Sequence, residues 1–391
     1  MRVQPNRTLT RVVSVVFAAA AYVGLLSADI RQTTPDDFVR LVAAGKVDDA
    51  WSAWNALPSG PEKLRIGVAI AGAAGQIARG LELYDQLMAA GQPPDGPALA
   101  ALALGTANGL ATSVDRDVRV IACGAAVVLQ PGHKACRTAL EQLARQEDDV
   151  VGRGLAAYAL ANAGIRLPVL ANGDFERSLT RDARLRVAQV SVRLPPDERL
   201  AILRPLFDDP DSVVVYQALL VAGDVPGGDV LAALRALQPP PAVRMGKTIA
   251  LVRHGDRPSI EAAVEMLDGI TGYERVQVGR GLVESLDQRG VAVLEQVADG
   301  PVDIDRVHAA EALARINPDR ARRALVESLT RGSSAVQSAA LHAAGIVRIA
   351  DDRAVYGRLT HGEEMVRAFA VEAVANTLVP LPPQPLPATY Q

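Results

Sequence analysis

The sequence predicts an all-α protein, a right-handed α-solenoid of stacked antiparallel helix pairs preceded by an N-terminal transmembrane or signal helix. Three observations support this fold class. Helical phrases recur at a nearly constant spacing, 49% of the residues are hydrophobic while only 4% are aromatic, and the chain has 391 residues. A single core rarely organises a chain of that length, whereas a repeat array grows without limit. We therefore expect one solenoid with thin layers of Ala, Leu and Val between its helices.

The repeat is marked by nine apolar residues, each near the start of a helical phrase. Consecutive members are 28 to 35 residues apart, and the mean is 31, because 248 residues divide into eight intervals. That spacing is typical of two-helix units, each of which buries its apolar face against a neighbour. The nine residues are Val118, Val150, Leu185, Val213, Val243, Val276, Val307, Val336 and Val366.

The first element in the chain is an apolar segment with a basic flank. Arg2, Arg7 and Arg11 precede an uncharged run from Val12 to Ala28. This order is typical of a secretory signal peptide or an uncleaved signal anchor, and a buried helix is the alternative. Residues 1–30 thus predict an exported protein, and the Ala- and Arg-rich composition suggests a bacterial one. The solenoid is then periplasmic and held at the inner membrane, or periplasmic or secreted after cleavage.

Residues 35–96 contain two phrases that resemble helices of tetratricopeptide-like repeats. One spans residues 44–51 and the other residues 79–87, and apolar side chains in both are three and four positions apart. We expect Gly45 and Gly80 to precede the two helices. The resemblance implies a short helical-repeat region before the main solenoid.

Residues 97–379 repeat a first helix, a short turn with Asp or Pro, and a second helix. The clearest second helix spans residues 303–316, where acids precede Val307 and alanines follow at helical spacing. Related phrases begin at Asp115, Asp182, Tyr273 and Glu363. They resemble HEAT repeats, including the short repeats of phycobilin lyase-type proteins. Physical chemistry explains the pattern, because an acid caps a helix N-terminus and small alanines let helices approach closely.

The last predicted helix ends near Val379. The prolines between residues 380 and 387 then prevent a helix and favour an extended conformation. Residues 380–391 are therefore predicted to form a Pro-rich tail, and a ligand for a proline-binding domain is the alternative.

Six arginines lie near the start of second helices, and the resemblance places those helices on the concave face. As a basic strip they would bind an acidic peptide or another polyanion. In the competing interpretation, nearby acids pair with them in a ladder between units, and the balance of 41 basic and 44 acidic residues favours that ladder. The candidate partner-binding residues are Arg119, Arg186, Arg244, Arg280, Arg306 and Arg367, and the candidate acids are Asp117, Asp182, Glu274, Asp305 and Glu364.

Histidines and cysteines give weak signals for chemistry. His308 and His342 are 34 residues apart on successive second helices and are expected to be stacked neighbours. Neither belongs to the His-Glu pairs of HEAT-like di-iron hydroxylases. Cys123 and Cys136, with His133 between them, leave a zinc ion one ligand short. We expect two buried thiols, and a disulfide is the alternative. No metal and no cofactor are predicted.

Two near-identical glycine phrases and a tryptophan pair have structural explanations. Residues 151–155 and 278–282 both read Val-Gly-Arg-Gly-Leu, but no strand or further glycine completes a nucleotide-binding motif. We expect close helix packing there. Trp51 and Trp54 are at helical spacing and are expected in the core, with ligand stacking as the alternative.

These observations favour a non-catalytic protein-interaction scaffold, exported or membrane-anchored, that binds a protein or peptide partner. The alternative is a HEAT-type lyase-like enzyme acting on a protein-bound chromophore, which only the resemblance suggests. A HEAT-type DNA glycosylase would need an intracellular location and a basic groove. The formal net charge of -3 argues against nucleic acid as a partner.

Overall fold

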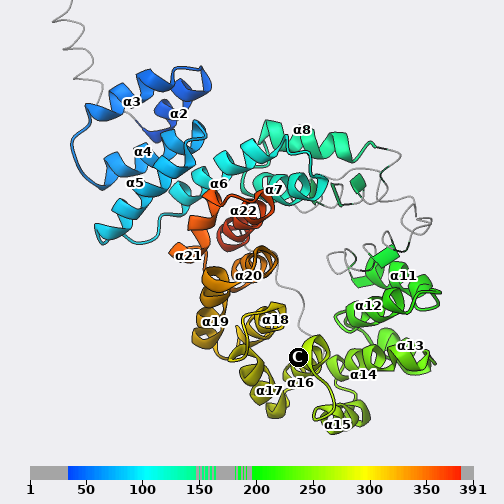
Figure 1. Cartoon of the computed structure of the whole chain (residues 1–391). Helices are drawn as coiled ribbons and strands as arrows, with labels where there is room; N and C mark the ends of the chain where they lie inside the picture. Colours follow the sequence, from blue (N-terminus) through cyan, green and yellow to red (C-terminus); the bar gives the residue numbers. More distant parts are fainter. Residues whose placement is uncertain are drawn as a thin grey trace, which may run out of the picture. The chain divides into compact units, whose positions relative to one another are not determined.

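Every regular element that the structure describes is helical. The computed structural model describes residues 34–146, scattered residues from 149 to 191, and residues 196–379 (Figure 1). The protein forms two compact units, residues 1–105 and 106–391. The predictions for residues 1–30 and 380–391 lie outside the described residues. Among the helices that are described, none combines the length and the apolar character needed to cross a bilayer.

The first unit consists of short helices joined by tight turns. A capping box between Thr34 and Asp37 starts its first helix, in which each side chain satisfies a backbone group of the other residue. Gly45 adopts a φ of +77° in the turn that follows, a conformation that favours glycine. The helices are α2 (Pro35–Ala43), α3 (Val47–Asn55), α4 (Pro61–Ala73), α5 (Ile77–Ala89) and the start of α6 (Gly96–Leu110).

The placement of Gly80 before a helix was wrong. This residue lies inside α5, and the turn before that helix uses Gly75, with a φ of +70°. A Cβ atom at Gly80 would approach Leu102 Cδ2 to 2.3 Å, so the glycine permits a close approach of α6. The apolar period predicts the helix, but it does not separate a turn glycine from a packing glycine.

Trp51 belongs to the core of the first unit, as predicted, whereas Trp54 is only half-buried. Trp51 is 7% exposed, and its ring meets that of Trp54 edge to face at 5.2 Å. Both indole nitrogens donate hydrogen bonds within the unit, Trp51 to the Gln76 side chain and Trp54 to the Lys63 carbonyl. These bonds satisfy the polar atoms that burial would otherwise leave unpaired.

The second unit contains a row of helices, each packed against the next, and we call it the stacked row. Flanking helices alternate with the row along the sequence. The row consists of α12 (Ser212–Ala222), α14 (Arg244–Arg253), α16 (Gly272–Glu284), α18 (Ile304–Leu313), α20 (Ser334–Val347) and α22 (Glu364–Leu378). The flanking helices are α11 (Pro196–Leu206), α13 (Gly228–Ala236), α15 (Arg257–Met266), α17 (Gln288–Ala298), α19 (Pro318–Arg331) and α21 (Arg353–Tyr356). Short 3-10 turns, Pro241–Val243 and Gly357–Thr360, precede α14 and α22.

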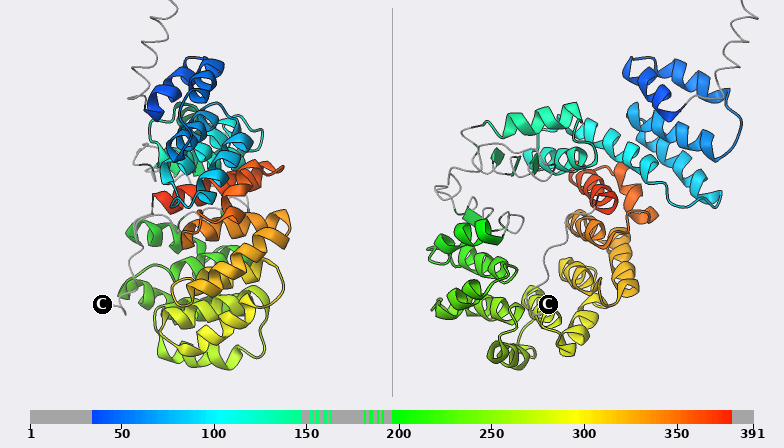
Figure 2. Two further views of the ribbon diagram at one scale, coloured as in Figure 1. Left: turned by 90° about the vertical axis from the view of Figure 1, so that its left-hand side faces the viewer. Right: turned by 180° about the vertical axis from the view of Figure 1, so that it is seen from behind.

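The last helix of the row packs against α7 (Arg116–Leu129), which belongs to a helix pair near the start of the same unit. The partner of α7 in this pair is α8 (Lys134–Leu143), and α22 lies beside α7 (Figure 2). The Ser113 hydroxyl and the Glu364 carboxylate form a hydrogen bond of 2.5 Å across this contact. An open solenoid end exposes an apolar face and needs a cap. Here α7 covers α22, and Val366, Ala370 and Val374 are all fully buried.

Most of the repeat-marking residues are core residues, but Val213 is an exception. It is 45% exposed, whereas the next residue, Val214, is fully buried. Asp211 caps α12, and the third residue after a cap is the buried one in α7 and α20 as well. The predicted register in this repeat was therefore one residue too early. Val118, Val243, Val276, Val307, Val336 and Val366 are buried, Leu185 is partly buried, and Val150 lies outside the described residues.

Acidic caps and small residues set the spacing of the row, as the sequence indicates. The Asp303 carboxylate accepts the backbone N–H of Arg306 at 2.9 Å and starts α18. Gly279 and Gly281 pack in opposite directions, toward Leu294 of α17 and Val252 of α14, and a Cβ atom at either position would lie 3.1 Å from its neighbour. The second glycine phrase therefore serves helix packing. The first phrase is only partly described.

Candidate protein-interaction surface

Three of the six predicted arginines hold the loop before their own helix. Arg306 donates to the Gly300 carbonyl at 3.0 Å, and Arg367 donates to the His361 carbonyl at 2.7 Å. Arg119 makes the same bond to the Ser113 carbonyl, again six residues earlier in the sequence. These guanidinium groups satisfy backbone oxygens at the loop, so part of their hydrogen-bonding capacity is used inside the protein.

The other predicted arginines differ from one another. Arg244 is the first residue of α14, and its side chain is exposed without a partner among the described residues. Arg280 is 34% exposed and contacts Glu284 at 2.8 Å and Glu311 at 3.8 Å. Although burial opposes this effect, these two carboxylates and Asp224 raise the pKa of Arg280. Arg186 lies outside the described residues.

A ladder of charges connects the stacked row, and its central member escaped the sequence analysis. Arg253 at the end of α14 is only 3% exposed. Its guanidinium donates to Asp224 at 3.0 Å, to Gln277 at 2.6 Å and to the Leu220 carbonyl at 3.0 Å. The carboxylate of Glu284 lies 3.5 Å from its Nε. Arg253 thus joins three successive helices of the row.

The ladder continues through Arg280 to α18, and its carboxylates are Asp224, Glu284 and Glu311, none of which is a predicted acid. Asp117 pairs with Arg116 at 3.0 Å, and Glu364 lies 3.5 Å from Arg367 within one helix. Burial raises the pKa of Asp305, and the charge of Asp303 adds to this effect. A ladder exists, therefore, with largely different members.

His308 and His342 lie on successive helices and are close enough for their charges to interact. The Tyr273 ring meets His308 edge to face at 5.5 Å, and His342 Nδ1 lies 3.0 Å from the Glu372 carboxylate. Burial lowers the pKa of His308, which favours the neutral ring. Within the described part of the protein, no group of three or more metal-binding side chains occurs.

The two cysteines are buried neighbours on α7 and α8. Cys123 and Cys136 are fully buried, their thiols share a hydrogen bond, and both are free. The Cys136 thiol also donates to the Ala107 carbonyl at 3.7 Å. This arrangement matches the expectation of two buried thiols.

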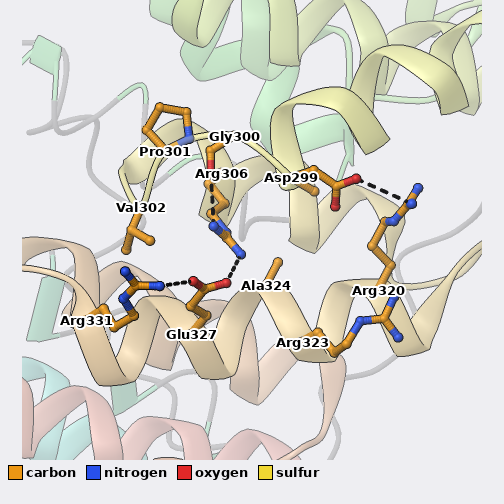
Figure 3. Close-up of a pocket in the computed structure, with 11 residues that line it drawn as sticks. Asp299, Gly300, Pro301, Val302, Arg306, Arg320, Arg323, Ala324, Glu327 and Arg331 are labelled. Carbon is orange, nitrogen blue, oxygen red and sulfur yellow. Dashed lines mark hydrogen bonds and ion pairs between the residues drawn. The ribbon is translucent and has the colours of Figure 1, made fainter.

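A pocket of about 510 Å³ opens between the α17–α18 loop and α19 (Figure 3). Its walls carry four arginines and two acids, so its lining has a formal charge of +2. The loop and α18 contribute Asp299, Gly300, Pro301, Val302 and Arg306, while α19 contributes Arg320, Arg323, Ala324, Glu327 and Arg331. Two successive helix pairs therefore form one concave polar site.

Most of the charges in the pocket are paired. The Glu327 carboxylate lies between Arg306 and Arg331, with its bond to Arg331 at 2.6 Å. These hydrogen bonds, with that of Arg306 the largest effect, lower the pKa of Glu327. Arg320 contacts Glu295 at 2.6 Å and Asp299 at 3.4 Å.

Two donors in the pocket remain unused. Arg323 is exposed and has no hydrogen bond or ion pair among the described residues (Figure 3). The Nε atom of Arg306 is buried and has no acceptor among the residues that the structure describes, and the side chain is only 9% exposed. An uncommitted guanidinium group such as that of Arg323, in a partly enclosed cavity, is typical of sites that bind anionic groups.

No protein-family model matches the sequence, and no curated protein is similar enough in sequence to match it. The likeness to HEAT and tetratricopeptide-like repeats therefore remains an inference from the phrases themselves.

Of the four pocket arginines, only Arg306 lies near the start of a second helix, where the repeat pattern predicts binding arginines. Arg320, Arg323 and Arg331 lie on a flanking helix. Intervals of three residues between Arg320 and Arg323 and of eight between Arg323 and Arg331 place the three on one face of α19, which is a usable signal. The opposing loop becomes a wall only through tertiary packing.

Proposed function

We propose that this protein is a non-catalytic interaction scaffold made of HEAT-type repeats in a right-handed solenoid, with tetratricopeptide-like repeats before them. The observation that carries the proposal is the arginine pocket, because it is concave, polar and formed between two successive helix pairs. Such seams recur in repeat proteins and supply their binding surfaces. The scaffold binds a protein or peptide on the concave face that the second helices line, and the pocket at the α17–α18 loop and α19 is a further contact for the same partner.

Charge supports a protein partner over nucleic acid. The whole protein has a formal net charge of -3. Several arginines of the stacked row are committed to internal carboxylates, and acids line the pocket beside its arginines. Backbone recognition of nucleic acid requires many unpaired cations, and its affinity rises with their number.

Localisation is part of the same proposal. Residues 1–30 direct export and either anchor the protein in a bacterial inner membrane or are removed. The helical repeats then face the periplasm or the exterior. The basic flank at Arg2, Arg7 and Arg11 before an uncharged run supports this orientation.

The proposal is tested by crosslinking the full-length tagged protein in cells that make it naturally, followed by membrane extraction and mass spectrometry. We expect one protein to be enriched over a mock purification. A matched bait with Arg244→Glu reverses the charge of an exposed arginine of the stacked row whose side chain has no partner among the described residues. Reduced recovery with this bait would support the predicted strip, and equal recovery would remove the strip from the proposal. No enriched protein with either bait would overturn the scaffold function.

A further inference from the structure

We infer that the pocket between the α17–α18 loop and α19 binds the carboxylate groups of an acidic peptide segment, which the partner protein supplies. This inference rests on the proposed scaffold function and specifies the partner's chemistry at one site. The occupant is a short run of Glu or Asp side chains, or the terminal carboxylate of a polypeptide next to such residues.

The pocket shows how its arginines hold a carboxylate. Glu327 accepts hydrogen bonds from both Arg306 and Arg331. The two guanidinium groups are thus spaced to hold a planar carboxylate between them. The parallel N–H donors of a guanidinium suit the two oxygens of such a group. A second carboxylate finds the donors of Arg323 unused in the same pocket, on the side toward Arg320 (Figure 3).

The net charge favours an anionic occupant. Four arginines against Asp299 and Glu327 give the lining a formal charge of +2. Although Glu295 also contacts Arg320, one positive charge is still uncompensated. The low solvent access at Arg306, with its side chain 9% exposed, strengthens the attraction relative to that at an open surface.

The size of the pocket suits a few side chains. Its volume of about 510 Å³ lies within the range of roughly 300–1,000 Å³ that is typical of ligand sites. A single inorganic ion would leave most of it filled with water. A segment of two or three acidic residues fills the space and contacts both the loop and α19.

Carboxylates fit the local charges better than phosphate groups do. A phosphate carries about -1.5 to -2 charges at pH 7, and Glu327 and Asp299 lie in the same cavity. Like-charge repulsion from these acids grows with the charge of the ligand. A carboxylate bears a single charge and shares the donors with Glu327 at a smaller cost.

The test measures fluorescence anisotropy of a labelled tetraglutamate peptide with the full-length protein, and a tetraglutamine peptide is the control probe. Wild-type protein is expected to bind the acidic probe only. Arg323→Gln should raise the dissociation constant about fivefold, because it removes the free guanidinium. Melting temperature should stay unchanged, since Arg323 has no partner among the described residues.

Arg315→Gln is the matched control for overall charge. This arginine is exposed, has no partner in the described part of the protein, and does not line the pocket. Its substitution should change the dissociation constant by less than about twofold, through long-range attraction alone. Equal effects of Arg315→Gln and Arg323→Gln, or no binding by the wild-type protein, would overturn the inference.

Glu327→Gln gives a result of opposite sign. The amide keeps an acceptor for Arg306 but removes the competing charge, so the acidic probe should bind about threefold more tightly. A circular-dichroism spectrum checks that this variant folds. Weaker binding by a folded Glu327→Gln variant would contradict the inference. Stronger binding of a phosphoserine peptide than of tetraglutamate would overturn the choice of carboxylate.

The failure of this inference is distinguishable from the failure of the scaffold function. If crosslinking identifies a partner that wild-type and Arg323→Gln baits recover equally, the scaffold stands and the pocket assignment falls. If no partner is recovered at all, the scaffold function fails independently of the peptide measurements.

Discussion

Replacement of Arg253 by methionine tests whether the charge ladder holds the stacked row together. The side chain is 3% exposed, and it bonds Leu220, Asp224 and Gln277 beside two neighbouring helices. Methionine fills a similar volume but donates no hydrogen bond. The change therefore removes the contacts and retains most of the packing.

The size of the expected loss in unfolding free energy depends on whether water can replace Arg253 as the partner of each acceptor. Asp224 and Glu284 side chains are 18% and 26% exposed, so water compensates them in part. Gln277 is 5% exposed and keeps an unpaired oxygen. A buried acceptor without a partner costs about 1–3 kcal/mol, and removal of one member of a buried ion pair costs about 3–5 kcal/mol. We expect Arg253→Met to lower the free energy of unfolding by about 3 kcal/mol.

The assay is urea denaturation of the full-length protein, followed by circular dichroism at the helix band. Arg244→Met is the control, because that side chain is exposed and has no described partner; its effect should stay within about 0.5 kcal/mol. An Arg253→Met effect as small as that of the control would refute the reasoning and show that the ladder contributes little to stability.

Four further outcomes follow from the same structure. Ala310 is fully buried, so Ala310→Leu should overpack α18 and lower the free energy of unfolding by about 1–3 kcal/mol; an unchanged melting curve would contradict the close packing. Arg119→Ala should lower the free energy of unfolding in urea denaturation by about 1 kcal/mol, because it removes the bond to the Ser113 carbonyl. Unchanged stability would show that this loop contact does not stabilise the protein. Burial lowers the pKa of His254 below its value in the unfolded protein. The unfolded protein thus binds more protons, so the free energy of unfolding falls as pH decreases from 7 to 5. The His254→Gln variant should show a smaller fall over the same pH range. Identical pH profiles of the variant and the wild-type protein would exclude His254 as a cause. A reporter fused after Gln391 should be active only outside the cytoplasm, and cytoplasmic activity would refute export.

The fold class was predictable because its signals are local. Asp303 followed by Val307 and buried Ala310 shows a cap, a core residue and a packing residue in one phrase. Local signals fail where two positions satisfy the same pattern. Val213 and Val214 are both valines after a cap, and only the geometry of the first turn decides that the second is buried.

Contacts between distant segments had no sequence signal. The packing of α22 on α7 joins Ser113 to Glu364, 251 residues apart, and no repeat period specifies which helix covers the last one. Arg253 stands at the end of its helix, whereas the repeat pattern marks arginines at helix starts. The pocket combines a loop with a flanking helix, so its arginines are unrelated in sequence until the protein folds.

The scaffold proposal is tested most directly by photo-crosslinking of the full-length protein in intact cells. A photoreactive amino acid replaces Arg323 in one variant and Arg315 in another, and crosslinked products are identified by mass spectrometry after membrane extraction. The account predicts that the variant with the probe at position 323 captures one defined protein through an acidic segment, and that the variant with the probe at position 315 captures much less of it. Formation of no heterologous protein adduct at either position, while both variants remain folded, would contradict the account.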